Sequence, residues 1–126
     1  MEERRKRILL VDDSRTALMM TALLLRGGPF DLLTAENGQV AVEKALKEAP
    51  DLVLLDVVMP VMDGFEVVKH LRREERTRSL PVVMLTTRGE SDNVEQGFRL
   101  GCTDYLTKPV NGPELLAKIN ALLGVS

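Results

Sequence analysis

The chain has 126 residues, of which 44% are hydrophobic and 29% are charged, a balance typical of one globular domain rather than a disordered segment. The net charge of −2 gives no global signal for nucleic acid or an anionic membrane, and a single cysteine, Cys102, excludes an internal disulfide framework and fits a reducing compartment. No apolar run approaches the ~20 residues of a membrane span, and the charged N-terminus lacks the apolar core of a secretory signal. We therefore expect a cytoplasmic protein with one domain over residues 1–126, a core at about residues 7–124, and no effector domain in this chain.

Short apolar runs alternate with amphipathic segments in the N-terminal half. Ile8 to Val11 predict a buried strand that ends at Asp12 and Asp13. Ser14 is expected to cap the helix after it, which stops at a Gly-Gly-Pro sequence. A second strand over residues 30–35 is followed by a turn and a second helix.

The run from Leu52 to Leu55 is the most informative stretch of the sequence. It is short, rich in Val and Leu, and lies between two prolines, which predicts a strand buried on both faces. Asp56 follows directly, so one carboxylate is expected at the tip of this strand. Asp63 is expected to cap a third helix, and the apolar stripe of that helix consists of Phe65, Val68 and Leu71.

Two more strand–helix pairs complete the chain. Residues 81–85 predict a strand that ends at Thr86, and a weaker helix interrupted by glycines follows. The sparse core positions expected in that helix are Val94, Phe98 and Leu100. A last strand over residues 102–107 ends at Lys108, and Gly112-Pro113 opens a fifth helix.

Five repeats of strand then helix predict the fold class. The pattern is typical of an α/β protein with a doubly wound, five-stranded parallel sheet in the order 2-1-3-4-5, helices on both faces, and a flavodoxin-like topology. Ligand sites in such sheets lie at the carboxyl ends of the strands. Five side chains follow strand ends and are expected to line one crevice: Asp12, Asp13, Asp56, Thr86 and Lys108.

Three carboxylates in one crevice repel one another unless one is protonated or a cation lies among them. Ligands that are all oxygen, with no histidine or thiol nearby, favour Mg²⁺. Lys108 adds a positive charge and Thr86 adds a hydroxyl donor. This collection could stabilise a phosphoryl group beside a carboxylate nucleophile.

At these residues the sequence resembles the receiver domain of response regulators in two-component signalling, of the chemotaxis-regulator type. The resemblance extends from Arg7 to Leu123. Any one of its motifs has an ordinary structural explanation, such as a helix cap or a surface lysine, but all of them occur together and in order. They are the Asp12-Asp13 pair, Leu55-Asp56-Val57-Val58-Met59-Pro60 with Asp63-Gly64, Thr86, and Tyr105-Leu106-Thr107-Lys108-Pro109.

The resemblance implies a role for each residue of the site. Asp56 would accept a phosphoryl group from a histidine kinase or a phosphotransfer domain, and Lys108 would pair first with Asp56 and then with its phosphate. Thr86 would turn toward the phosphate, and Tyr105 would rotate inward behind it. Mg²⁺ would be bound by Asp13 and Asp56 directly, by Asp12 largely through water, and by the backbone carbonyl of Val58.

The resemblance also implies how the signal leaves the domain. The output face would be formed by the fourth helix, the fifth strand and the fifth helix, and would control a downstream protein or an effector domain of the same protein. A homodimer on phosphorylation is a further expectation. The domain would bind neither nucleic acid nor membrane directly, and it would not be an enzyme beyond catalysing its own phosphorylation and dephosphorylation.

Three positions are expected to tune the lifetime of the phosphoryl group. Thr87 stands where a smaller residue is usual, so access to the site is expected to be tighter. Val58 and Arg88 hold the two variable positions that flank the site in this family. Because the Val58 side chain has no polar group to guide water, we expect slow self-dephosphorylation.

Other functions are weaker alternatives. A phosphohydrolase of the haloacid-dehalogenase kind needs a second Asp two residues after the nucleophile, where this chain has Val58. A flavodoxin-like cofactor binder needs small hydroxyl residues where Asp12 and Asp13 stand. A degenerate receiver that binds a partner without phosphorylation remains the main alternative, although the complete set of site residues argues against it.

Overall fold

The computed structural model describes residues 5–87 and 91–124, and the side chains of these residues except Thr87 and residues 91–94. Within these ranges strands and α-helices alternate five times. Their bounds are β1 (Lys6–Val11), α1 (Arg15–Leu25), β2 (Phe30–Ala35), α2 (Gly38–Glu48), β3 (Leu52–Asp56), α3 (Gly64–Arg73), the short 3₁₀ helix η1 (Glu75–Thr77), β4 (Val82–Thr87), α4 (Ser91–Leu100), β5 (Asp104–Lys108) and α5 (Gly112–Leu123).

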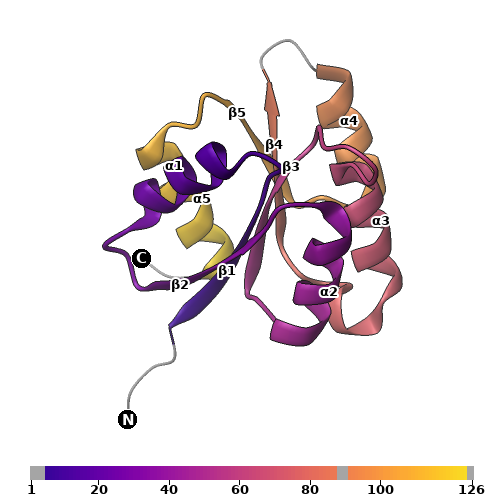
Figure 1. The fold of residues 1–126 in the computed structure, drawn as a ribbon, viewed down its shortest axis with the longest axis horizontal. Coiled ribbons are helices and arrows are strands. Elements are labelled where there is room, and N and C mark those ends of the chain that lie inside the picture. Colours follow the sequence, from indigo (N-terminus) through magenta and orange to yellow (C-terminus); the bar gives the residue numbers. More distant parts are fainter. Residues whose placement is uncertain (1–4, 88–90, 125–126) are drawn as a thin grey trace.

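The strands form one parallel sheet in the order β2-β1-β3-β4-β5. Figure 1 shows α1 and α5 on one face of this sheet and α2, α3 and α4 on the other. The predicted fold class, strand order and helix layers are therefore confirmed. The described residues contain no helix with both the length and the apolar character needed to cross a bilayer.

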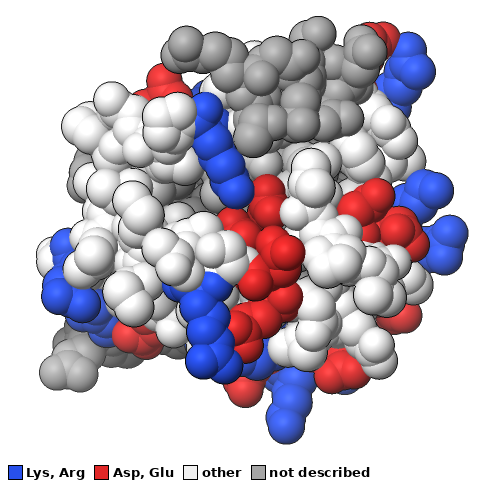
Figure 2. Space-filling model, turned by 45° about the horizontal axis from the view of Figure 1, so that its top comes forward, with Lys and Arg blue, Asp and Glu red and all other residues white. Residues whose placement is uncertain are grey.

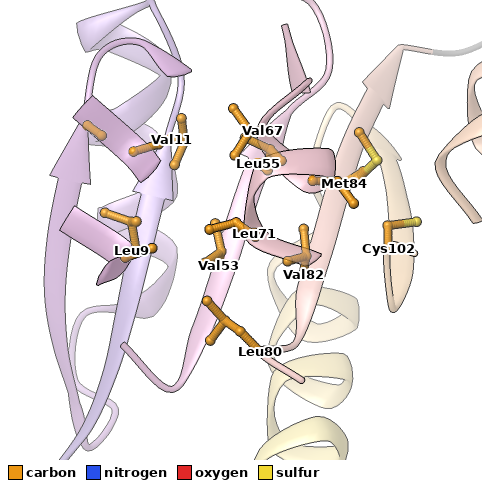
Figure 3. Close-up of a cluster of buried hydrophobic side chains, with 14 of the residues drawn as sticks. Leu9, Val11, Val53, Leu55, Val67, Leu71, Leu80, Val82, Met84 and Cys102 are labelled. Atoms are coloured by element: carbon orange, nitrogen blue, oxygen red, sulfur yellow. The ribbon is translucent and has the colours of Figure 1, made fainter. Parts of the chain in front are cut away.

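Side-chain alternation along the strands builds a separate hydrophobic core on each face of the sheet. On β1, Leu9 and Val11 pack toward α2 and α3, whereas Ile8 and Leu10 pack toward α1 and α5. The strand β3 is buried along its whole length, as its sequence predicts. Figure 3 shows the cluster on the α2–α3 side, which extends to Met84 on β4 and to Cys102.

Helix starts follow the capping chemistry expected from the sequence. Ser14 accepts a hydrogen bond from Ala17 N at 3.2 Å, and Asp63 forms a reciprocal capping box with Glu66. Asn37 and Asn111 cap α2 and α5 with their side chains, which accept hydrogen bonds from Val40 N and Glu114 N. These caps fix where each helix begins relative to the strand end that precedes it.

Two predictions near α4 and β5 are corrected by the structure. Phe98, expected in the core, is 46% exposed, and the buried position of α4 beside it is Gly97. A side chain on Gly97 would lie 2.8 Å from Met84 Sδ, so the helix packs too closely on the sheet for any larger residue there. The last strand begins at Asp104 rather than at Cys102, which precedes it as a buried thiol whose pKa is raised to about 11 by burial.

Candidate functional site

Three charged side chains from three strands meet at the carboxyl edge of the sheet. Lys108, at the end of β5, donates from Nζ to Asp56 Oδ1 at 3.1 Å and to Asp12 Oδ2 at 3.2 Å. Because β1 and β3 are neighbours and β4 separates β3 from β5, Lys108 reaches across the end of β4 to both carboxylates. Side chains two positions apart on a strand point to the same face. Asp12, Asp56 and Lys108 come two residues after Leu10, Leu54 and Leu106, which belong to the core on the α1–α5 face, so all three charged side chains lie on that side of the sheet.

A third carboxylate, Asp13, completes an acidic cluster at this edge. Asp12, Asp13 and Asp56 each present one oxygen, and these oxygens lie within 4.8 Å of one another. Asp12 and Asp56 are buried, whereas Asp13 is exposed. Figure 2 shows acidic side chains gathered in the middle of this face, beside a broad uncharged area on the left, where α1 lies.

Asp12 is held at both of its oxygens. Oδ1 accepts a hydrogen bond from the backbone N–H of Ser14 at 3.0 Å, while Oδ2 accepts from Lys108. Since Ser14 is also the N-cap of α1, the same turn that starts the helix fixes the orientation of this carboxylate. The carboxylate is therefore oriented before any ligand binds.

Gly64 sets the geometry of the loop that follows Asp56. Its N–H donates to the carbonyl of Val57 at 2.9 Å, which closes the loop between β3 and α3. A Cβ at this position would lie 2.7 Å from the Asp56 carbonyl oxygen and 2.9 Å from Val57 Cα. Because both contacts are with backbone that has little freedom to move, only glycine allows α3 to start so close to the site.

The surroundings of Asp56 disfavour its ionised form and raise its pKa. Burial raises the pKa of Asp56, the hydrogen bond and charge of Lys108 oppose this, and the charges of Asp12 and Asp13 raise it further. Burial alone would lower the pKa of Lys108, but its contacts with Asp56 and Asp12 outweigh burial and raise it. The cluster thus has one ammonium group and three carboxylates, and a single positive charge does not neutralise three negative ones.

This donor set fits a divalent metal ion that prefers oxygen ligands. Three negative charges against one positive charge leave a net charge of −2 at the cluster when all four groups are ionised. The spacing of the oxygens suits a cation that keeps water among its ligands, and Mg²⁺ is the common ion of that kind. Carboxylate and water ligands do not favour softer transition metals.

Thr86 and Tyr105 lie together on the opposite face of the sheet. Thr86 is buried at the end of β4, two positions after the core residue Met84. Tyr105 stands opposite Met84 in the β4–β5 register, so its side chain shares that face. Its ring meets that of Phe98 edge to face, with centroids 5.9 Å apart and planes at 86°. Thr86 thus stands between the strand of Asp56 and the strand of Tyr105.

The three positions predicted to tune the lifetime of a phosphoryl group are placed only in part. Val58 lies in the loop after Asp56, and its side chain is exposed toward solvent. Thr87 ends β4, but its side chain lies outside the described residues, as does the whole of Arg88.

In the loop between β3 and α3, Val61 is fully exposed with φ of 68°, a left-handed conformation that a β-branched residue adopts at a cost in backbone energy.

Sequence reasoning missed an apolar surface that borders the site. Met20 and Leu24 of α1 line a groove of about 200 Å³ together with Asp12, Lys108 and Val110. Met20 is 62% exposed, and together with Leu24 it forms an apolar surface patch of the kind that marks interaction sites. Helical spacing made α1 look like an ordinary core helix. The breadth of its apolar face, with Met19 and Leu23 also exposed, was the available clue.

The model of the response regulator receiver domain family matches residues 8–120. The chain belongs to this family. The match covers every strand end that contributes to the acidic cluster, and it confirms the resemblance inferred from the motifs. The receiver domain is thus the part of two-component response regulators to which this chain corresponds.

Relatives of known name include both long and short response regulators. The chain is 42% identical to the phosphate regulon transcriptional regulatory protein PhoB of Pseudomonas aeruginosa over 94% of its own length, but it spans only 52% of that protein. Against the protein PilH of the same organism the identity is also 42%, and the match covers 93% of this chain and 97% of PilH. The chain therefore spans about half of the PhoB relatives and nearly all of PilH.

Solved structures give the same picture. A response regulator from Chloroflexus aurantiacus superposes with a TM-score of 0.91 at 34% identity, covering 94% of this chain and 98% of that one. The chemotaxis protein CheY4 of Vibrio cholerae gives 0.86 at 35% identity, covering 93% and 98%. The receiver domain of the sensor histidine kinase PA1611 of P. aeruginosa gives 0.87 at 28% identity, covering 94% and 98%, and holds a magnesium ion in its active-site cleft.

Proposed function

We propose that this receiver domain accepts a phosphoryl group on Asp56 from the phosphohistidine of a histidine kinase or a phosphotransfer domain. The observation that carries the proposal is the pairing of one buried carboxylate, Asp56, with Lys108 inside a cluster of three carboxylates at the sheet edge. A structural aspartate gains nothing from two like-charged neighbours, because their repulsion raises its pKa. A nucleophile that must be charged, accessible and close to a bound cation does need such a cluster.

The proposed transfer uses the groups already in place. A carboxylate oxygen of Asp56 forms a bond to phosphorus as the bond from phosphorus to the donor imidazole nitrogen breaks, and the freed imidazole leaves with the electron pair of that bond. The ammonium group of Lys108, now 3.1 Å from Asp56, offsets the charge on the phosphoryl oxygens. The acceptor is the chain's own side chain, so the domain would catalyse only its own phosphorylation and dephosphorylation.

Asp12, Asp13 and Asp56, with the backbone carbonyl of Val58, would hold Mg²⁺. The ion supplies positive charge to the phosphoryl oxygens when it is bound. Asp12 already uses both oxygens for Ser14 and Lys108, which supports its expected role through water. Exposed Asp13 and the tip of Asp56 are left to act as direct ligands.

The donor would dock on the apolar part of α1 that borders the site. Met20 and Leu24 line the same groove as Asp12 and Lys108, so a protein seated on α1 could place a histidine side chain over the cluster. We assign this groove to the donor protein because two groups of the cluster, Asp12 and Lys108, form part of its lining. Apolar contact area there would supply the affinity that a transient complex needs.

The output would be a change of the α4–β5–α5 face toward a downstream protein, an effector domain or a second copy of the domain. The phosphoryl group brings about −1.5 to −2 charge and new acceptor oxygens. Thr86 directly follows Leu85, the β4 register partner of Asp56, and shares a face of the sheet with Tyr105, which supports a link from the site to this surface. Direct contact with nucleic acid or a membrane is not part of the proposed output.

Intact mass after incubation with acetyl phosphate tests the proposal. Wild type should gain one phosphoryl group when Mg²⁺ is present and none when it is chelated, and Asp56→Asn should gain none. Asp63→Asn serves as a matched control, since this residue caps α3 in the loop after Asp56. If wild type binds Mg²⁺ but gains no mass from acetyl phosphate or from phosphorylated kinases, the domain is the alternative form, a receiver that binds its partner without phosphorylation.

A further inference from the structure

The aromatic contact between Phe98 and Tyr105 joins the two elements of the proposed output face. Phe98 lies near the end of α4 and Tyr105 lies on β5, and their rings meet edge to face at 5.9 Å. Phe98 is 46% exposed and Tyr105 is 37% exposed, so the pair sits at the rim of the domain rather than in its core. An edge-to-face pair is attractive beyond the area that it buries.

The packing beside Phe98 leaves the ring no place inside the domain. Its neighbour Gly97 faces the sheet, where a Cβ would lie 2.8 Å from Met84 Sδ and 3.2 Å from Cys102 Sγ. With this side of α4 closed against the core, the next residue along the helix is directed toward the rim. There Phe98 meets the ring of Tyr105, which is directed outward.

Two residues, Phe98 and Thr86, border different positions that the Tyr105 ring could occupy on its face of the sheet. Phe98 contacts the ring in the outward position, whereas Thr86 lies further along the same face, two residues beyond Met84 and opposite Thr107. Movement of the ring toward Thr86 would break the contact with Phe98. The strength of this contact therefore sets how readily Tyr105 leaves the rim.

We propose that Phe98 is a latch that holds Tyr105 outward and so favours the unphosphorylated arrangement of α4 and β5. The proposal rests on the proposed function, because it concerns the switch that phosphorylation of Asp56 would operate. Loss of a contact of this geometry should raise the ratio of inward to outward Tyr105 about two- to twelvefold. Phe98 acts through Tyr105 and touches no reacting atom, so it is a positioning residue.

The chain provides its own reporter, since Tyr105 is its one tyrosine and it has no tryptophan. Quenching of tyrosine fluorescence by acrylamide measures how accessible this ring is. In Phe98→Leu without any phosphoryl donor, quenching should fall, because the released ring moves inward. If quenching rises or stays the same, Phe98 merely covers the ring and the latch is refuted.

A second measurement separates the latch from the chemistry at Asp56. Acetyl phosphate should label Phe98→Leu about two- to twelvefold faster than wild type, whereas Phe30→Leu, the same change on the far side of the sheet, should label at the wild-type rate. Equal rates for wild type and Phe98→Leu would overturn the latch while leaving the proposed function intact. No labelling of wild type would overturn the proposed function, and the quenching result would still decide the latch.

Discussion

Lys108 Nζ lies 3.1 Å from Asp56 Oδ1, and this contact joins strands β5 and β3 across the end of β4. The two residues are separated by 52 positions in the chain. Both are held on one face of the sheet by the alternation that buries Leu54 and Leu106. The fold thus brings together a carboxylate and an ammonium group that no local sequence pattern could join.

Asp56→Asn should stabilise the folded domain at neutral pH. Because burial and two neighbouring carboxylates raise the pKa of Asp56 above its ordinary value of 3.8, its ionised form destabilises the fold, while Asn can still accept a hydrogen bond from Lys108. We expect a gain of about 0.5–2 kcal/mol in the free energy of unfolding at pH 7, measured by urea denaturation without Mg²⁺.

The sign of this effect fixes its pH dependence. A carboxyl group whose pKa is raised in the fold destabilises the protein fully above that folded pKa and no longer below its ordinary pKa of 3.8. The advantage of Asp56→Asn should therefore shrink as the pH falls toward 4. Saturating Mg²⁺ should also reduce it, since the ion stabilises wild type. Asp31→Asn, at an exposed ion pair with Arg5, should change stability little. A less stable Asp56→Asn at pH 7 would contradict the electrostatic account.

Gly64→Ala should destabilise the domain and disturb the site. The added methyl group would lie within 3.0 Å of two backbone atoms at Asp56 and Val57, which must shift to accommodate it. We expect a loss of about 1–3 kcal/mol and weaker Mg²⁺ binding, measured by thermal unfolding and by titration with the ion. Gly112→Ala is the matched control. It also changes the first residue of a helix, but its nearest neighbour is the flexible tip of Leu24 at 3.3 Å.

Met20→Lys should slow phosphorylation by a protein donor but not by acetyl phosphate. The charge would enter the groove that Met20 shares with Lys108, where the donor is proposed to dock, while the reacting groups remain in place. A drop of at least tenfold in the transfer rate is expected, which corresponds to about 1.4 kcal/mol of lost contact energy. Met19→Lys is the control, because this equally exposed methionine lines a different groove, with Glu36 and Val40. Equal effects of the two substitutions would move the docking surface away from this groove.

Val58→Asn should shorten the lifetime of the phosphoryl group. The side chain at this position, two residues after Asp56, is exposed, and an amide there could orient water for attack where valine cannot. We expect a several-fold shorter half-life, on the order of the contribution of one positioned polar group, measured by loss of phosphoryl mass after removal of the donor. A half-life that Val58→Asn leaves unchanged would show that the slow hydrolysis expected for wild type has another cause.

Most of the fold could be predicted because its signals are local. The three central strands β1, β3 and β4 contain short apolar runs, and α1, α2, α3 and α5 each begin at a polar cap. The order of elements and the sheet topology therefore follow from the chain. The strand ends then predict which residues meet. The clustering of Asp12, Asp56 and Lys108 was expected for this reason, and their contacts match it.

The parts that sequence reasoning missed depend on contacts between distant elements. Gly64 was noted as part of a family motif, but its tight contact with the Asp56 backbone became visible only in three dimensions. Phe98 was placed in the core because it falls at helical spacing, whereas the close approach of Gly97 to Met84 turns it to the rim. The spacing of apolar residues predicts which face of a helix is apolar, but it does not predict how closely that face can approach the sheet.

The most direct test of the central claim is to locate the phosphoryl group itself. Borohydride reduces an acyl phosphate to an alcohol, so treatment after acetyl phosphate and Mg²⁺ should convert the labelled aspartate to homoserine, which peptide mass spectrometry can place. The account predicts homoserine at position 56 alone, and none without Mg²⁺. Homoserine at position 12 or 13, or label that survives in Asp56→Asn, would contradict the assignment of Asp56 as the phosphoacceptor.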